Sequence, residues 1–173
     1  MYYRSNNKKH TFALIDSLPL AFPIGAQRKY SDLGFTVLGE IIEKISGQAM
    51  EQFMKEKIFE PLGMLHTGYL PNKNQLIAPT SFGNAYEYRM VHDPKLGFVF
   101  NEIDPKSWNG WRQYNLYGEV NDGNAWYASG GISGAAGLFS TSEDISHLTS
   151  MLQNKGRFQN HQFLSEKTIQ QFL

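Results

Sequence analysis

The pattern that most constrains the fold of this chain is an amphipathic helix predicted over roughly residues 32–46. Apolar residues recur there every three or four positions and therefore share one helix face; they are Leu33, Val37, Leu38, Ile41, Ile42 and Ile45. Asp32 suits the N-cap or the first turn, where a carboxylate meets free N–H groups. Gly47 suits the position after the helix, because glycine adopts a left-handed conformation readily.

The sequence predicts further helices on either side of an irregular middle. They are expected around 11–17, over 49–59 before Pro61, after the capping residue Thr141, and after Ser165. Between about 67 and 130 the periodicity is lost, and Gly, Asn, Pro and aromatic residues are frequent. A plain loop of that length is uncommon, so we expect short strands and turns around aromatic anchors, or a segment that packs on parts of the protein outside this chain.

Composition excludes several functional classes. Lys plus Arg and Asp plus Glu both number 16, and this zero net charge lacks the basic footprint of a nucleic-acid binder. No apolar run approaches the ~18 residues of a membrane span. There are no cysteines, and the five histidines form no H-E-x-x-H pattern, so we expect no metal and no cofactor. No signal peptide is visible, and periplasmic, secreted and cytoplasmic locations all remain open.

Four short blocks follow one another along the chain. They are Tyr30-Ser31-Asp32 at the head of the predicted helix, FEPLGM from Phe59 with Thr67-Gly68-Tyr69 after it, GEVNDGNA from Gly118, and GGISGAAGLFST from Gly130. In this order they resemble the class C β-lactamase-related serine hydrolases, which include β-lactamases, DD-peptidases (penicillin-binding proteins) and esterases. The resemblance implies an α/β fold, in which an antiparallel sheet flanked by helices adjoins a helical region.

The resemblance also implies acyl transfer through a serine nucleophile, with a lysine three residues later and a tyrosine sharing the proton transfers. Carried onto this chain, Tyr30 is the general base and acid. Asp32 occupies a position where many relatives have Asn, and it would orient the lysine or a substrate amide. A free tyrosine has a pKa near 10 and needs a nearby cation to act as a base. Asp32 would shift that pKa the wrong way if it lies close.

Five further residues are candidates for substrate binding. By resemblance, Gly134, Ala135 and Ala136 border the substrate cleft, with Ala135 in place of the usual His. The same glycine-rich block is also typical of a tight turn between a strand and a helix. Asp122 and Asn124 either bind substrate or fold a loop, and the loop role is the favoured interpretation.

The nucleophile motif has no convincing match. Ser5-Asn6-Asn7-Lys8 fits Ser-x-x-Lys by letter, but two Asn residues favour no helix, and the match lies too close to Tyr30 for the family pattern. We therefore expect residues 1–173 to be a single partial domain without the N-terminal Ser-x-x-Lys part and the C-terminal strand part. Such a chain should be mainly α, with irregular loops, minor strands and exposed apolar faces.

Three functional hypotheses follow. The first is a fragment of a serine hydrolase, inactive alone, whose parent cleaves an ester or an amide such as a β-lactam or a peptidoglycan peptide. The second is a non-catalytic module derived from that fold that binds a glycan or a peptide. The third is a truncated product without a function of its own.

Overall fold

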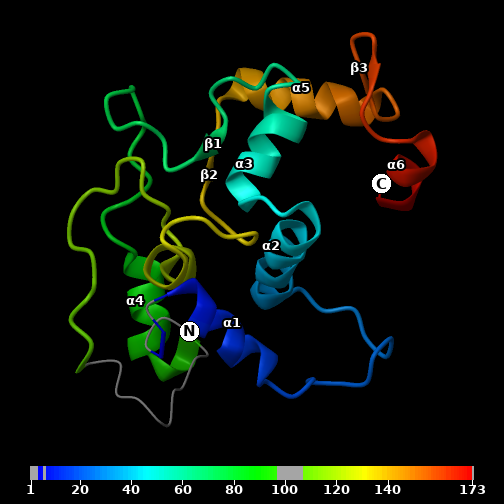
Figure 1. Ribbon diagram of the computed structural model, residues 1–173. Coiled ribbons are helices and arrows are strands. Elements are labelled where there is room, and N and C mark those ends of the chain that lie inside the picture. The colour runs from blue at the N-terminus through cyan, green and yellow to red at the C-terminus, as the bar shows by residue number, and fades with distance from the viewer. Residues whose placement is uncertain (1–3, 6, 97–106, 173) are drawn as a thin grey trace.

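The structure is a computed structural model that describes residues 4–5, 7–96 and 107–172. Its helices are α1 (Lys8–Asp16), α2 (Asp32–Ser46), α3 (Met50–Met54), α4 (Ala85–His92), α5 (Ser142–Gln153) and α6 (Glu166–Phe172). π-Helical turns follow at Lys55–Phe59 and Asn124–Ala128, and a 3₁₀ turn at Pro94–Leu96. Two short antiparallel pairs join β1 (Gly68–Tyr69) to β2 (Leu138–Phe139) and β3 (Arg157–Phe158) to β4 (His161–Gln162). Figure 1 shows α2 and α3 between α1 below and α5 above. The prediction of a mainly α chain with minor strands is confirmed.

Helix α2 begins and ends where the sequence predicts. The side chain of Ser31, rather than Asp32, caps it by accepting a hydrogen bond from the N–H of Gly34 at 3.2 Å, and Asp32 lies in the first turn. Gly47 ends the helix with φ 68°, and its N–H donates to the carbonyl of Glu43. The cap therefore fixes the direction in which the chain enters α2, directly after Tyr30.

The helix predicted over 49–59 is present, with an α-helical first half, α3, and a π-helical second half. From Lys55 the backbone widens into a π-helical turn, in which the N–H of Glu60 donates to the carbonyl of Lys55 at 2.9 Å. Phe59, at the end of this turn, and Leu62 beyond it belong to one apolar cluster. Both side chains are buried there.

The principal core lies between this segment and α5. Its buried members are Phe59, Leu62, Met64 and Met151, and the partly buried residues around them are Met54, Ile58, Leu148, Leu152, Phe158 and Phe163. The N-terminal end of α5 is joined to the chain before β1 through Asp144, which is 2% exposed. Its carboxylate accepts from the N–H of His66 at 2.8 Å and from the hydroxyl of Thr67 at 2.7 Å. Thr141 caps α5 as predicted.

The middle segment contains a helix that the sequence analysis did not predict. Asn84 caps α4 by accepting from the N–H of Glu87 at 2.9 Å, and its amide donates to the carboxylate of Glu87 at 2.6 Å. Asn84 and Glu87 thus bond each other at the start of the helix, through the side chain of Asn84 in both bonds, and this Asn-x-x-Glu spacing was the signal that could have identified the helix. Beside it, Phe82 pairs with Asn115 in an isolated antiparallel bridge. The part of the segment at 97–106 lies outside the described residues.

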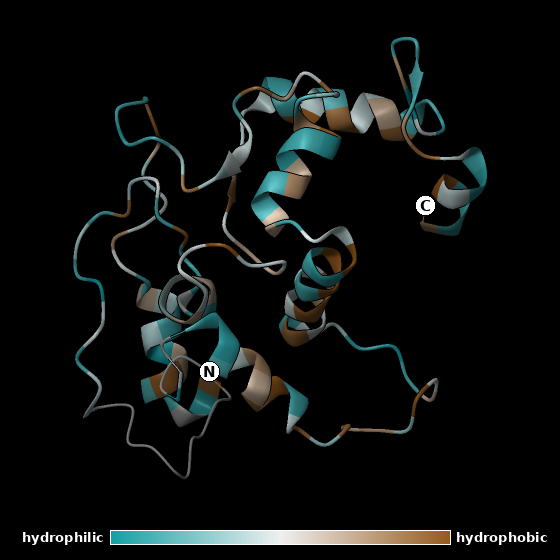
Figure 2. Ribbon diagram, in the orientation of Figure 1, coloured by the Kyte–Doolittle hydropathy of each residue, from teal (hydrophilic) through white to brown (hydrophobic). Residues whose placement is uncertain are grey.

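The surface of the chain is large for its mass. It measures 12,011 Å², whereas a compact protein of 19.7 kDa is expected to expose roughly 8,600 Å². Part of the excess comes from the apolar stripe of α2, formed by Phe35, Leu38, Ile41 and Ile45, which are 44%, 54%, 43% and 83% exposed. Brown, hydrophobic residues are visible along this helix in Figure 2. The exposed apolar face that the sequence predicts is therefore present.

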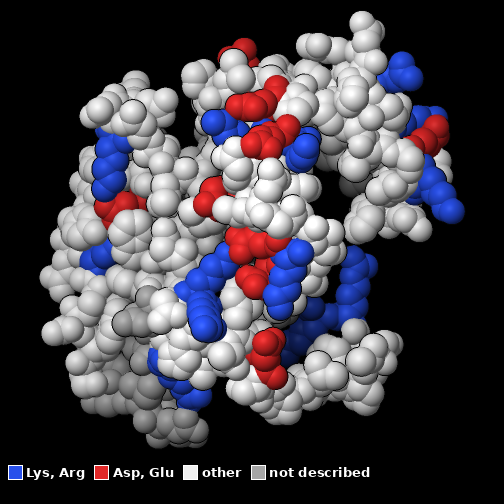
Figure 3. Space-filling view, in the orientation of Figure 1, with Lys and Arg blue, Asp and Glu red and all other residues white. Residues whose placement is uncertain are grey.

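Charged side chains of both signs mix on the face shown in Figure 3, in keeping with the zero net charge. Among the helices of the described residues, none combines the length and the apolar character that crossing a membrane requires.

Candidate functional site

Tyr30 lies at the surface immediately before α2. It is 75% exposed, and its ring centroid lies 5.7 Å from that of Phe35 in the first turn of the helix. A hydrogen bond with Asp32 and the negative charge of Asp32 raise the pKa of Tyr30, and burial and the charge of Asp122 add to the rise. Tyr30 is consequently protonated at neutral pH in this chain, and it needs a neighbouring cation before it can accept a proton.

A small polar cavity gathers four of the predicted site residues. Asp32, Asp122, Asn124 and Ala135 all line it, together with side chains that include Thr36 and Ser133. Its volume of 20 Å³ is enough for about one water molecule. Because both carboxylates of this cavity also raise the pKa of Tyr30, the tyrosine and the cavity belong to one electrostatic site.

Asp122 and Asn124 have different surroundings. One carboxylate oxygen of Asp122 accepts from the N–H of Ala125 at 2.7 Å, which begins the π-helical turn. Asn124 is the first residue of that turn, and its side-chain oxygen is buried without a hydrogen-bond partner among the described residues. Since a buried polar atom without a partner costs free energy, this oxygen is an acceptor available to a water or a ligand in the cavity.

The glycine-rich block turns tightly at Ser133–Ala136. The N–H and C=O groups of these two residues bond each other at 3.2 and 3.3 Å. Within the turn, Gly134 packs so closely on α2 that a Cβ atom would overlap the carbonyl oxygen of Phe35. Gly134 also lines a second cavity of 10 Å³ beside Gly39, whereas Ala136 is not among the lining residues of either small cavity.

Two of the polar residues in the cavity wall that the sequence analysis did not select, Thr36 and Ser133, lie in contact. The hydroxyls of Thr36 and Ser133 lie 3.4 Å apart, which joins α2 to the turn. The hydroxyl of Tyr69 donates to the carbonyl of Ser133 at 3.3 Å. Thr36 stands four residues after Asp32, on the same helix face, and this spacing was the signal that could have identified it.

A buried arginine holds the loop that carries Asp122. The guanidinium of Arg112 donates to the carbonyls of Val120 and Asn121, both at 2.8 Å, and lies 3.6 Å from the carboxylate of Glu119. Burial acts to raise the pKa of Glu119, but hydrogen bonds from Lys73 and Tyr114 and the charges of Lys73 and Arg112 hold it below its ordinary value. The sequence offers no motif for this arrangement.

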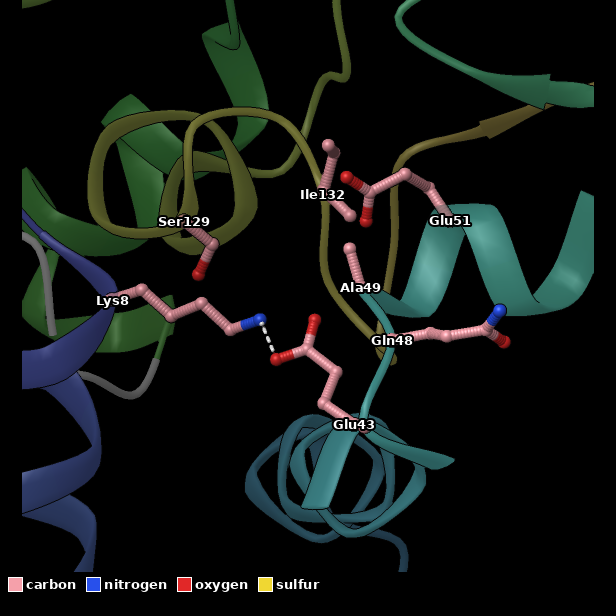
Figure 4. A pocket seen from close by; sticks show the side chains of 8 residues that line it. Lys8, Glu43, Gln48, Ala49, Glu51, Ser129 and Ile132 are labelled. Carbon is pink, nitrogen blue, oxygen red and sulfur yellow. Dashed lines mark hydrogen bonds and ion pairs between the residues drawn. The ribbon is translucent and has the colours of Figure 1, made fainter. Parts of the chain in front are cut away.

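Ser5 and Lys8 are not arranged as a nucleophile and its base. Ser5 is 4% exposed, and its hydroxyl donates to the carbonyl of Asn7 and accepts from Thr11, both at 3.0 Å. Figure 4 shows Lys8 pointing from α1 across a hollow of 540 Å³ toward Glu43 of α2, and the two side chains form an ion pair at 2.5 Å. Ser5 is therefore inaccessible, and the ammonium of Lys8 is engaged by Glu43.

The described residues contain no group of three or more His, Cys, Asp or Glu side chains arranged to hold a metal ion.

Comparisons with known proteins place this geometry in a family. The family model described as Beta-lactamase matches residues 2–172. Proteins of Salmonella agona and Salmonella newport that are named as D-alanyl-D-alanine carboxypeptidases are each 32% identical over 97% of this chain. The chain spans 36% of the length of these relatives.

Solved structures show the same fold. The penicillin-binding protein homologue from Pyrococcus abyssi, an octamer, superimposes with a TM-score of 0.57 at 22% identity, over 95% of this chain and 30% of that one. A penicillin-binding protein from Bacillus halodurans gives 0.57 at 21% identity, over 95% of this chain and 39% of that one. The family match over almost the whole chain and the shared fold lead to one conclusion: the chain belongs to the β-lactamase family of serine hydrolases.

Proposed function

We propose that this chain supplies the tyrosine part of the active site of a serine hydrolase that removes D-alanine from peptides ending in D-alanyl-D-alanine. The curated relatives carry the name of that activity. The observation that carries the proposal is the placement of Tyr30, which is exposed at the head of α2 beside the polar cavity of Asp32, Asp122 and Asn124.

In the proposed acyl transfer, the serine, Tyr30 and a lysine each have one role. A serine hydroxyl attacks the carbonyl of the penultimate D-alanine, the C–N bond breaks, and the leaving amine takes a proton. Water then attacks the acyl-enzyme, which releases the shortened peptide and restores the serine hydroxyl. Tyr30 accepts the proton of the serine and donates it to the amine. The ammonium of a lysine near Tyr30 would offset Asp32 and lower the pKa of the phenol into a useful range.

We further propose that residues 1–173 form one partial domain and are inactive alone. Tyr30 is held protonated by Asp32, Lys8 is paired with Glu43, and Ser5 is buried. In this proposal the Ser-x-x-Lys part and the final strand part come from polypeptide outside these residues. Without them the site lacks a nucleophile, a cation for Tyr30 and the backbone donors of an oxyanion hole.

Two surface properties support a partial domain. The exposed area exceeds that of a compact protein of this mass by more than a third. The apolar stripe of α2 is open along three turns of the helix that follows Tyr30. Large exposed apolar faces of this kind mark surfaces that are covered in the functional protein.

Labelling the isolated chain tests this proposal. The purified 173-residue protein is treated with a fluorescent penicillin or a fluorophosphonate, and its intact mass is measured alongside turnover of p-nitrophenyl butyrate. We expect no adduct and no turnover above buffer. A stoichiometric adduct on a serine of this chain would contradict the proposal, and peptide mapping would then identify that serine.

A further inference from the structure

A further cavity, none of whose lining residues lines the cavities described above, lies between the start of α4 and residues 111–113. Its volume is 240 Å³, which is the size of a small ring compound rather than of a water molecule. Three aromatic side chains, two amides, an alanine and an arginine line it. These residues are Phe82, Tyr88, Trp111, Asn84, Gln113, Ala85 and Arg112.

Aromatic contacts hold the walls of this cavity in place. The ring of Tyr88 stacks on His92 with centroids 4.0 Å apart and meets Trp111 nearly at a right angle at 5.1 Å. Trp111 in turn meets Trp108 edge-on at 4.9 Å, and Trp108 meets Tyr127 in the same way. Such rings offer flat apolar faces at little cost in conformational entropy.

The rim is fixed by backbone hydrogen bonds. The N–H of Gly83 donates to the carbonyl of Tyr114, and the N–H of Leu116 donates to the carbonyl of Ser81, both at 2.8 Å. This short ladder holds Phe82, whose side chain is 63% exposed, at the cavity. The cavity is thus formed before any ligand binds.

The polar groups of the cavity select against a charged ligand. The guanidinium of Arg112 is only 4% exposed, and its charge is already met by two carbonyls and by Glu119. Its Nε atom is nevertheless buried without a hydrogen-bond partner among the described residues. Tyr88 and Gln113 are exposed, and within the described part of the chain the Tyr88 hydroxyl and the Gln113 side-chain amide have no hydrogen-bond partner. The wall therefore combines apolar ring faces with unused neutral donors and acceptors.

We propose that this cavity binds a neutral sugar ring. The C–H face of a pyranose packs on an aromatic ring, and its hydroxyls pair with amide and phenol groups of the kind that Gln113 and Tyr88 present. A wholly apolar ligand that covered these exposed groups would remove their water without replacing its hydrogen bonds, at a cost in free energy. An anion or a cation would find no uncompensated charge beside it.

The cavity is joined to the site at Tyr30 through one carbonyl group. Arg112 and Asn84, which both line the cavity, donate to the carbonyl of Asn121 at 2.8 and 2.9 Å. The next residue is Asp122, which lines the polar cavity near Tyr30. A sugar ring bound here would thus lie beside the loop that faces the cleavage site. The identification of that ring with the glycan of a peptidoglycan strand rests on the proposed function, whereas sugar binding itself does not.

Titration of the 173-residue chain with N,N′,N″-triacetylchitotriose tests the inference without any turnover. Trp111 lines the cavity, so its fluorescence reports a ring that stacks there. We expect a saturable change with a Kd on the order of 1 mM, typical of a small, single-ring contact. No saturable change at concentrations well above that value, or saturation by p-cresol but not by the sugar, would overturn the proposal.

Two tyrosines of α4 provide a matched pair of variants. Tyr88 lines the cavity, whereas Tyr86, which is 67% exposed on the same helix, does not. Tyr88→Ala should weaken sugar binding about tenfold, as expected for the loss of one aromatic contact, and Tyr86→Ala should leave it unchanged. Equal losses in the two variants would contradict a site at this cavity.

A third variant separates binding from folding. Gln113 is exposed, so Gln113→Ala should preserve the far-ultraviolet circular dichroism spectrum. It should still weaken sugar binding severalfold, because an amide partner of the ligand is lost. Unchanged affinity in Gln113→Ala together with unchanged affinity in Tyr88→Ala would show that the sugar binds elsewhere. Because none of these measurements needs hydrolysis, failure of the sugar site and failure of the proposed function remain distinguishable.

Discussion

The backbone of Gly134 lies directly against the carbonyl oxygen of Phe35, with no space for a side chain between the turn and α2. Gly39 approaches the same turn from one helical turn further along, where a Cβ would lie 3.3 Å from the backbone nitrogen of Gly134. The contact joins the helix that follows Tyr30 to the glycine-rich block. It explains this glycine by close packing, whether or not the residue also touches a substrate.

Gly134→Ala should destabilise the chain by about 1–3 kcal/mol, because the clash is with backbone atoms that cannot rotate away. Urea denaturation followed by circular dichroism measures the effect. Gly68→Ala is the control, since a Cβ at position 68 meets no atom within 4 Å. A Gly134→Ala protein as stable as the parent chain would contradict the close contact with Phe35.

Asp32→Asn should lower the pKa of Tyr30 toward its ordinary value, because Asp32 supplies both the hydrogen bond and the charge that raise it. The phenolate absorbance of Tyr30 is obtained by subtracting the pH titration of a Tyr30→Phe chain. Glu143→Gln, which removes an acid from the first turn of α5, is the matched control. If Asp32→Asn leaves the Tyr30 titration where it was, the pairing of these two residues is wrong.

Asp144→Ala should cost about 1.5–3 kcal/mol, as expected for hydrogen bonds to a buried charged acceptor. The substitution removes the acceptor of the His66 N–H and the Thr67 hydroxyl. Glu143→Ala removes an exposed neighbour in the same helical turn, and it should change stability by no more than about 0.5 kcal/mol. Similar losses of stability in Asp144→Ala and Glu143→Ala would argue against the hydrogen bonds that connect α5 to the segment before β1.

The buried ion pair of Glu119 should make stability depend on pH. Its pKa is lowered from the ordinary value of 4.5 in the folded chain, so its stabilisation is fully present above that pH and is lost as the pH falls through the folded value. The parent chain should exceed Glu119→Gln in free energy of unfolding at pH 7, and the difference should narrow toward pH 3. Tyr114→Phe should remove only part of this dependence. If the difference in free energy of unfolding between the parent chain and Glu119→Gln stays constant from pH 7 to pH 3, Glu119 does not make stability depend on pH.

The elements that the sequence predicts well are those whose signals are local. Helix α2 has its apolar period, its acidic first turn and its terminal glycine within one stretch, and its bounds are those predicted. Helix α4 was missed because its apolar pattern is weak, although the side chain of Asn84 caps it by accepting from the N–H of Glu87. The π-helical turn after Met54 has no comparable local signal, because it follows from packing of Phe59 and Leu62 against distant residues.

In the candidate site, too, some residues were predicted from the sequence and some contacts were not. Asp32, Asp122, Asn124 and Ala135 were selected from three blocks of the sequence, and the structure brings them to one cavity. Other contacts form only when the chain folds. Gly39 packs against Gly134, and Arg112 donates hydrogen bonds to the carbonyls of Val120 and Asn121. Periodicity and composition carry no record of such contacts, so neither was predicted.

The most direct test of the account is a chimera in which these 173 residues replace the matching third of the Salmonella agona relative. Release of D-alanine from a peptide ending in D-alanyl-D-alanine is measured for the chimera and for its Tyr30→Phe and Tyr86→Phe variants. We expect activity in the chimera, an unchanged rate in Tyr86→Phe, and a fall of about 10²–10⁴-fold in Tyr30→Phe, the range for loss of a general acid–base group. Full activity in the Tyr30→Phe chimera would contradict the assignment of proton transfer to Tyr30.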